Sequence, residues 1–316
     1  MSLAVFLHTF TSILVLALII LLVVGLRRLG KLRQEHGVLF AWLVTHVTLP
    51  ALIFSALSHS TLEWKYLLLF LIMFGVELCL LLIAWLVGRF LQLEAPKMGA
   101  FLLVSAFGSS ALLGYALIVV LFPHDAAALS EGVFVSELGV GLPLFTVGVM
   151  VAMHYGRSSG DTQHLWSNAA LFFRSPIFVA ILLGLLWSFS PLGTRGPVIT
   201  PLFDAVDIVA HANTFLVTLT VGVLLSFSSL RPILGIALAT MLLKLLLSPA
   251  IVFLPASLMG LESWQMQVLL LEAAMPSAML SVVLSKQYGC DAELAAQLVF
   301  ITLVGSLFTT ALMIDL

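Results

Sequence analysis

The stretch LEAAMPSAMLS (residues 271–281) places a proline inside an apolar segment that is long enough to cross a lipid bilayer. Proline lacks a backbone N–H and its ring crowds the preceding turn, so a helix breaks or unwinds at Pro276. Glu272 lies one turn earlier, at a depth where an ionised carboxylate is costly. Within lipid, broken backbone is tolerated only where protein buries it or where it lines a wet cavity. The stretch therefore predicts a transport site near the middle of the membrane.

The composition of the chain excludes an ordinary soluble domain. Hydrophobic residues make up 62% of the sequence, charged residues make up 9%, and the mean hydropathy is +1.21. Soluble domains carry about 25% charged residues. The apolar runs continue for about 20 residues, as in membrane helices, and do not alternate as in barrel strands. We therefore expect an all-α, polytopic membrane protein whose surroundings are the lipid bilayer.

Ten apolar segments are expected to cross the membrane, and short links join them. They span residues 3–25, 38–57, 66–88, 98–122, 130–153, 171–189, 203–228, 231–257, 264–286 and 292–313.

Positive charge sets the expected orientation, because lysine and arginine gather on the cytoplasmic side. Ten spans put most of the cations on one side of the membrane, and only Lys65 and Arg195 fall on the other, while Lys244 lies within a span. Both termini are therefore expected outside the cytoplasm. The cations on the cytoplasmic side are Arg27, Arg28, Lys31, Arg33, Arg89, Lys97, Arg157, Arg174, Arg231 and Lys286.

Ten spans divide into two halves of five, which must have opposite orientations. We expect a first five-helix repeat over residues 1–153, a cytoplasmic linker over 154–168 and a second repeat over 169–316. Weak internal matches recur at an offset near 165 residues. They place SAFGSSALLG (105–114) over EAAMPSAMLS (272–281), with a consistent order along the chain.

Two pairs of polar residues also coincide under this alignment. His46 falls on His211, and Glu77 falls on Lys244. Such equivalence makes contact between Glu77 and Lys244 plausible, either as a pair that locks two helices together or as a coupling element.

The alignment names the fourth span as the partner of the proline break, because glycine and serine interrupt it at Gly108, Ser109, Ser110 and Gly114. Two interrupted helices in equivalent positions of inverted halves would cross near the midplane. The N-termini of their half-helices would present free N–H groups and a positive dipole end, an arrangement that favours an anion such as a carboxylate.

Three stretches resemble the auxin efflux carrier family, which includes the plant PIN proteins and many bacterial permeases. They are VTLPALIFSAL (47–57), SAFGSSALLGYALIVVLF (105–122) and the segment 271–313, which begins LEAAMPSAMLSVVLSKQYG. The resemblance implies ten spans in two inverted repeats, with spans 4 and 9 broken where they cross. It also implies elevator-type alternating access, in which spans 3–5 and 8–10 move against a scaffold of spans 1, 2, 6 and 7.

The sequence departs from the family pattern at the predicted crossing. Many members carry an asparagine where Ser109 and Leu280 stand and a proline where Ala116 stands, whereas Pro276 is retained. The substrate of other family members therefore cannot be carried over to this chain.

The candidate site residues fall into three sets. Expected substrate contacts at the crossing are Gly108, Ser109, Ser110, Pro276 and Ser277; candidates for coupling or buried charge are Glu272, Glu77, Lys244 and Glu137; and candidate scaffold contacts are His46, His211 and Asn213.

Each set has a structural alternative. Hydroxyl groups in a broken helix often donate hydrogen bonds to its freed carbonyls. The Glu137 carboxylate could cap a helix end or extend toward the membrane surface. His46 and His211 could face each other across the scaffold or serve in packing. Asp207 shares a helical face with His211, and its position near the outer end is consistent with simple hydration.

We expect a secondary transporter in the cell membrane, the inner membrane of a bacterium, that exports or exchanges a small organic anion such as a carboxylate. Protons, the membrane potential or the substrate gradient would drive it. The alternative is a sodium-coupled organic-anion symporter of the bile-acid type. We expect no enzyme activity, cofactor, metal centre or nucleic-acid partner, and a homodimer is left open.

Overall fold

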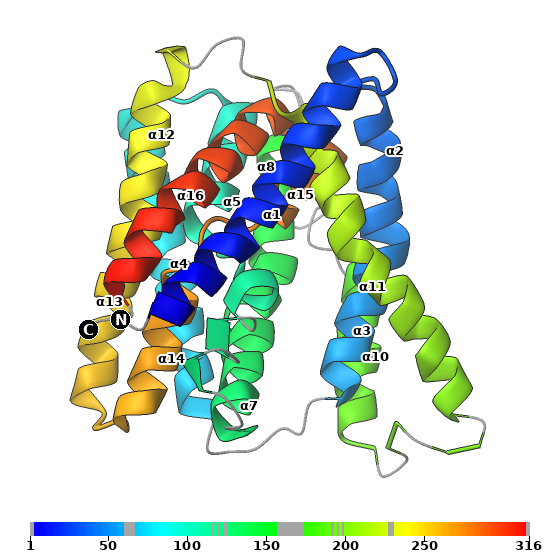
Figure 1. Cartoon of the computed structure of the whole chain (residues 1–316), viewed down its shortest axis with the longest axis vertical. Coiled ribbons are helices and arrows are strands. Elements are labelled where there is room, and N and C mark those ends of the chain that lie inside the picture. Colours follow the sequence, from blue (N-terminus) through cyan, green and yellow to red (C-terminus); the bar gives the residue numbers. More distant parts are fainter. Residues whose placement is uncertain are drawn as a thin grey trace.

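The computed structural model describes residues 3–59, 67–114, 117–118, 121–122, 126–156, 174–190, 193–194, 196–197, 199–226 and 231–313. Within these residues every named element is helical, as expected (Figure 1). In this described part of the chain, six helices are long and apolar enough to cross a membrane: residues 36–59, 68–90, 135–156, 199–224, 234–258 and 292–309. The apolar helices Ala95–Ala106 and Pro176–Ser188 are shorter than a full span.

The first half of the chain begins with α1 (Leu3–Arg28) and then forms a continuous helix from α2 (His36–Leu43), η1 (Val44–Thr48) and α3 (Leu49–His59). The next elements are α4 (Leu67–Phe90), α5 (Ala95–Ala106) and η3 (Ser110–Gly114). A second continuous path contains α7 (Ala126–Phe134), η4 (Val135–Gly141), η5 (Leu144–Gly148) and α8 (Val149–Gly156). The η elements here are wider π-helical turns.

The second half contains α10 (Pro176–Ser188), α11 (Ile199–Leu224) and a helix built from η6 (Arg231–Ile233), α12 (Leu234–Met241), η7 (Leu242–Leu247) and α13 (Ser248–Leu258). The chain closes with α14 (Ser263–Ala273), α15 (Leu280–Tyr288) and α16 (Ala292–Met313). The predicted linker 154–168 lies outside the described residues from 157 onward, as do Lys65, Arg157 and Arg195.

Local sequence signals explain several helix ends. At the start of α10, the Ser175 hydroxyl accepts a hydrogen bond from the Phe178 N–H at 3.2 Å, and Pro176 fits the first helical position. The helix α14 starts with a capping box between Glu262 and Gln265. The helix α15 ends at Gly289, whose φ of 86° lies in the left-handed region that glycine adopts without strain.

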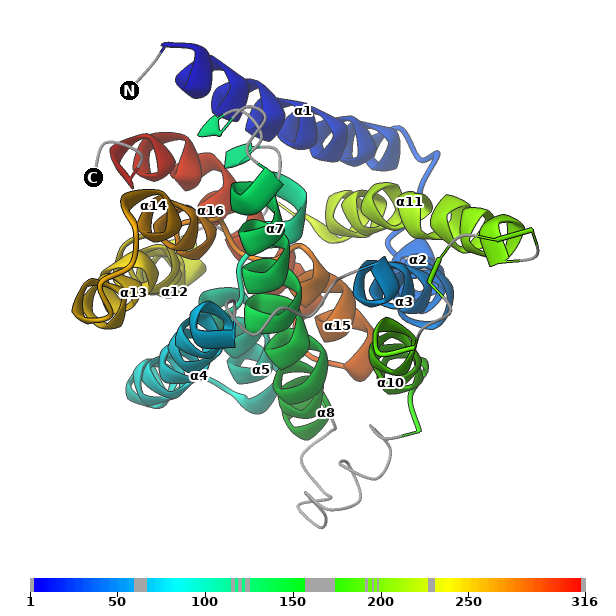
Figure 2. The same ribbon diagram turned by 90° about the horizontal axis from the view of Figure 1, so that it is seen from below.

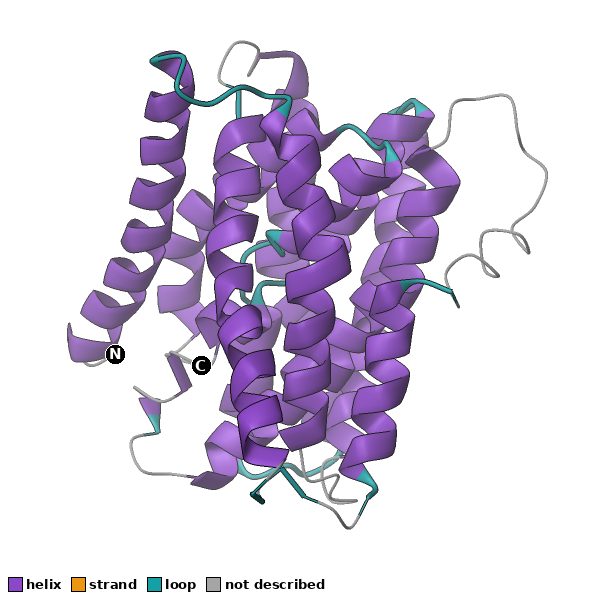
Figure 3. Ribbon diagram, turned by 90° about the vertical axis from the view of Figure 1, so that its right-hand side faces the viewer, coloured by secondary structure: helices purple, strands orange, loops and turns teal. Residues whose placement is uncertain are grey.

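Two helices stop in the middle of the bundle, at the two predicted breaks. After α5 the chain is extended at Phe107, and after α14 it is irregular until α15 begins (Figure 3). The Ser109 N–H donates to the Pro276 carbonyl at 2.7 Å, and the Ala278 N–H donates to the Phe107 carbonyl at 2.9 Å. Gly108 and Ser277 thereby form an antiparallel bridge. The two breaks therefore satisfy each other's backbone groups.

The helices pack in two groups. In one group α3 packs against α10 and α11, and α1 runs beside α11 (Figure 2). In the other, α4 packs against α5, η4 and α13, while α5 also contacts α8, α15 and α16. Contacts of α15 with α2, η1 and α11 join the groups. The start of α1 and the end of α16 lie near each other on one side of the bundle (Figures 1 and 2).

Candidate functional site

A cavity of about 390 Å³ lies between the two helix groups and reaches the paired breaks. Residues of α3 and α11 line it from one group, and residues of η4 and η5 line it from the other. Its innermost part is formed by Gly108, Ser109 and Ser110 of the first break and by Ala278, Met279 and Leu280 of the second.

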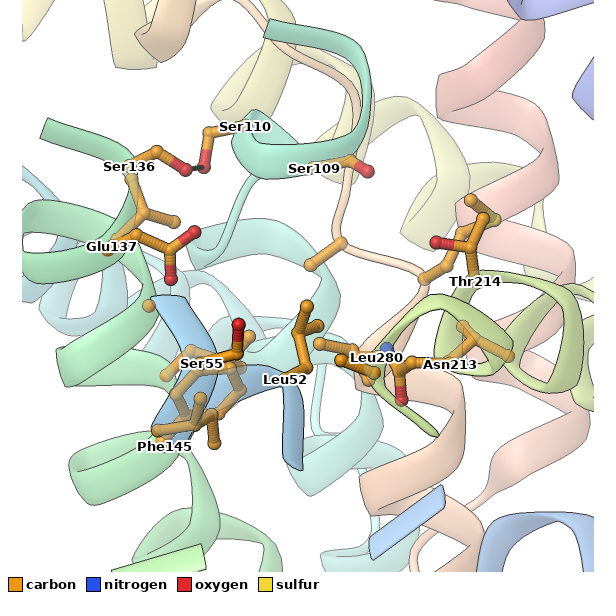
Figure 4. A pocket seen from close by; sticks show the side chains of 18 of the residues that line it. Leu52, Ser55, Ser109, Ser110, Ser136, Glu137, Phe145, Asn213, Thr214 and Leu280 are labelled. Atoms are coloured by element: carbon orange, nitrogen blue, oxygen red, sulfur yellow. Dashed lines mark hydrogen bonds between the residues drawn. The ribbon is translucent and has the colours of Figure 1, made fainter. Parts of the chain in front are cut away.

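Polar side chains gather on this cavity from four segments of the chain (Figure 4). Its wall also has an apolar part, which includes Leu52, Val140, Leu144 and Phe145. The polar lining residues are Ser55, Ser109, Ser110, Ser136, Glu137, Asp207, His211, Asn213 and Thr214.

Hydrogen bonds fix several of these side chains. The hydroxyl groups of Ser110 and Ser136 lie 2.8 Å apart and connect the first break to η4. The Ser55 hydroxyl donates to the Asp207 carboxylate and so connects α3 to α11. The Nδ1 atom of His211 lies 2.5 Å from the Asp207 carbonyl oxygen, one turn earlier on the same helix.

Two polar groups on the cavity keep unused hydrogen-bonding capacity. The Asn213 side chain is 4% exposed and its Oδ1 accepts from the Thr48 hydroxyl at 2.9 Å. Its amide NH₂ has no acceptor among the described residues. Ser109 is 8% exposed, and its hydroxyl likewise has no partner in the described part of the chain. Both groups are available to a bound molecule.

A buried ion pair lies beside the first break, and neither of its members lines the cavity. The Lys244 Nζ is 3.7 Å from the Glu77 Oε1, and both side chains are fully buried. The ammonium also donates to the Ala106 carbonyl and to the Ser248 hydroxyl, each at 3.4 Å. The structure thus brings together the two residues that the repeat alignment superimposes, and η7 and α4 supply them.

Gly108 lets this ammonium reach the break. A Cβ atom added at Gly108 would lie 3.0 Å from both the Cε and the Nζ of Lys244, which is closer than ordinary van der Waals contact. A larger residue would therefore displace the ammonium or the extended segment. Glycine at position 108 therefore leaves space for the charged end of Lys244.

Glu272 is fully buried at the end of α14 and does not line the cavity. Its carboxyl group lies against glycine: a Cβ atom at Gly114 would be 2.5 Å from Oε1, and one at Gly132 would be 3.6 Å from it. Neither oxygen has a hydrogen-bond partner among the described residues, although Lys244 and Glu137 lie within electrostatic range. Burying an ionised group without partners costs several kcal/mol, so this carboxyl group is a natural position for a proton.

Other predicted site residues lie away from the cavity. Pro276 and Ser277 are behind its lining, and the Ser277 N–H donates to the Thr302 hydroxyl at 3.3 Å. His46 does not meet His211. It stacks on Trp42 with 4.9 Å between ring centroids and lines a second cavity of about 280 Å³.

Sequence reasoning missed Ser55 and Thr214 as lining residues and assigned Asp207 to simple hydration. A signal was present for α11, since Asp207, Ala210, His211 and Thr214 follow the three- and four-residue spacing of one helical face. Ser55 carried no such signal, because its role depends on the distant helix α11.

Removal of one member of the buried pair should destabilise the protein more than removal of both. Glu77→Ala or Lys244→Ala leaves an uncompensated buried charge and should cost about 3–5 kcal/mol of unfolding free energy, whereas the double variant should cost less than either. Unfolding of the purified protein in detergent measures these values.

The exposed pair of Glu94 and Lys97 provides the matched control. Its atoms are 3.6 Å apart, but the side chains are 78% and 47% exposed, so its coupling energy should stay below about 1 kcal/mol. Additive effects of Glu77→Ala and Lys244→Ala would contradict the buried pair.

Comparison with known proteins places the chain in a family. A family model described as "Membrane transport protein" matches residues 8–164 and 165–314. A protein of Methanocaldococcus jannaschii named an uncharacterized transporter is 27% identical over 304 residues, covering 94% of this chain and 96% of its own. One from Methanothermobacter thermautotrophicus with the same description is 27% identical over 309 residues, covering 94% and 95%. The chain therefore belongs to the membrane transport protein family, the auxin efflux carrier family that its motifs resemble.

Proposed function

We propose that this multi-pass membrane protein is a secondary transporter that exports or exchanges a small organic anion, such as a carboxylate, through the cavity at the paired breaks. The observation that carries the proposal is the start of α15. The Ser281 and Val282 N–H groups donate to carbonyls of the preceding turn, whereas the backbone N–H groups of Met279 and Leu280 have no acceptor among the described residues. Met279 and Leu280 line the cavity, and no side chain caps this helix.

The start of α15 has the chemistry of an anion site. The first N–H groups of any α-helix lack acceptors within the helix, and the aligned peptide dipoles add partial positive charge at that end. A carboxylate in the cavity would accept from the N–H groups of Met279 and Leu280. The free NH₂ of Asn213 and the free hydroxyl of Ser109 would supply further donors.

The position of the cavity supports alternating access by relative movement of the two helix groups. One wall comes from α3 and α11 and the other from the breaks, η4 and η5. We propose ten spans in two inverted repeats, with the cell membrane as the location and both termini outside the cytoplasm. The breaks would carry substrate across the membrane as their group slides along the scaffold.

Glu272 is the proposed coupling residue. Its carboxyl group is buried without a partner in the described part of the chain, and it lies within electrostatic range of Lys244. Gain and loss of a proton there would change the charge beside the breaks and so bias the position of the moving group.

Transport in reconstituted vesicles tests the function. Proteoliposomes loaded with a panel of small radiolabelled carboxylates should show flux that depends on a gradient of protons, potential or substrate. Parallel reactions with and without sodium identify the coupling ion, and strict sodium dependence would reassign the protein to the bile-acid type of symporter. Absence of flux for the whole panel, with folded protein confirmed, would exclude the proposal.

Glu272→Gln should change the pH dependence of that flux, because glutamine has a similar shape and cannot exchange a proton. The expected result is a flatter pH profile, and Glu94→Gln, an exposed acid outside the site, should leave the profile unchanged. A Glu272→Gln profile that overlays that of the unmodified protein would remove Glu272 from coupling.

A further inference from the structure

The cavity has an acidic lining, although its helix terminus favours an anion. Glu137 of η4 and Asp207 of α11 both line it, and the described lining residues include no lysine or arginine. Within the described residues, the ammonium of Lys244 is paired with Glu77 and does not line the cavity. A substrate therefore meets two acidic side chains and the His211 imidazole together with the start of α15.

A molecule whose only charge is a carboxylate fits this arrangement poorly. It would add a third negative charge to a confined space, where weak screening strengthens repulsion between like charges. A molecule that also carries an ammonium group adds no net charge and places a cation near the two acids. The lining thus favours a substrate with both charges.

We propose that the substrate is a zwitterion, an amino-acid-like molecule with an ammonium group, a carboxylate and an apolar side chain. This inference rests on the proposed transport through this cavity and keeps its carboxylate position, but it replaces a simple anion with a zwitterion as the substrate class. The ammonium would lie at Glu137 and Asp207, and the carboxylate would accept from the start of α15.

The positions of the unused hydrogen-bond donors agree with separate places for the ammonium group and the carboxylate. Asn213 and Ser109 are more than nine-tenths buried, yet the amide NH₂ and the hydroxyl have no partner among the described residues. In the view of Figure 4, Glu137 lies toward one side of the cavity, and Asn213 and Leu280 lie toward the other. The donors that suit a carboxylate are therefore apart from the acid of η4.

The rest of the wall indicates the nature of the side chain. Leu52, Leu144 and Phe145 present apolar surface to the cavity. An aliphatic or aromatic side chain would bury against them, whereas a second carboxylate would lose its hydration there without a cationic partner. The proposed class is therefore an apolar amino acid rather than a dicarboxylate.

Matched ligand sets test the inference. Leucine, isocaproate and isoamylamine share nearly the same side chain. Leucine carries both charges, isocaproate carries only the carboxylate, and isoamylamine carries only the ammonium group. Phenylalanine, hydrocinnamate and phenethylamine form an aromatic set. Calorimetric titration of the purified full-length protein should show at least one zwitterion binding about tenfold or more tightly than either singly charged partner, the effect of one charged hydrogen bond.

Neutral variants of the acids provide a readout that a purely structural role would not produce. Asp207→Asn and Glu137→Gln should each weaken binding of the zwitterion about tenfold and should strengthen binding of the matched carboxylate, because one repelling charge is gone. Asp204→Asn is the matched control: Asp204 lies on α11, is exposed and does not line the cavity, so both affinities should stay unchanged.

The outcomes separate this inference from the proposed function. Carboxylates that bind as tightly as or more tightly than their amino acids would overturn the zwitterion and leave an anion transporter. Amines that bind while molecules with a carboxylate do not would overturn both ideas, as would a panel in which nothing binds. If a variant fails to fold, the ligand ranking of the unmodified protein still decides between these results.

Discussion

Two backbone hydrogen bonds between the broken helices are the interaction on which the rest of the site depends. They join Ser109 to Pro276 and Ala278 to Phe107. In a bilayer an unsatisfied peptide group costs several kcal/mol, so neither break would be stable alone at that depth. Each break is the other's hydrogen-bonding partner. The pairing opens two helices in the interior and leaves the start of α15 facing a cavity.

The same pairing organises the buried charges. Because Gly108 has no side chain, the Lys244 ammonium reaches the first break and pairs with Glu77. Gly114 and Gly132 leave space for the carboxyl group of Glu272. Gly108 and Gly114, which interrupt the predicted fourth span, therefore also leave space for ionisable side chains around the crossing.

The sequence predicted the features that depend on local chemistry. Proline and glycine mark both breaks, and hydropathy marks the helices. Internal similarity pairs Glu77 with Lys244, whose atoms prove to be 3.7 Å apart. Internal similarity also predicted that the two breaks cross, and the family resemblance implied the same crossing.

The sequence did not predict which groups face the cavity, since that depends on how distant helices are placed. Asp207 lines the cavity, where its carboxylate accepts from the Ser55 hydroxyl of the distant helix α3. Pro276 breaks the helix but does not line the cavity, and its carbonyl accepts from the Ser109 N–H. His46 superimposes on His211 in sequence, yet it faces a different cavity beside Trp42.

Cysteine accessibility at the paired breaks tests the central claim, that one side of the crossing faces a water-filled cavity and the other is sealed. In a background with Cys79 and Cys290 replaced by alanine, Ser109→Cys and Ser277→Cys are treated in membranes with a small charged thiol reagent. The account predicts rapid modification at position 109, which lines the cavity, and protection at position 277, which is 1% exposed. Equal reactivity of the two positions, or reaction at 277 alone, would contradict it.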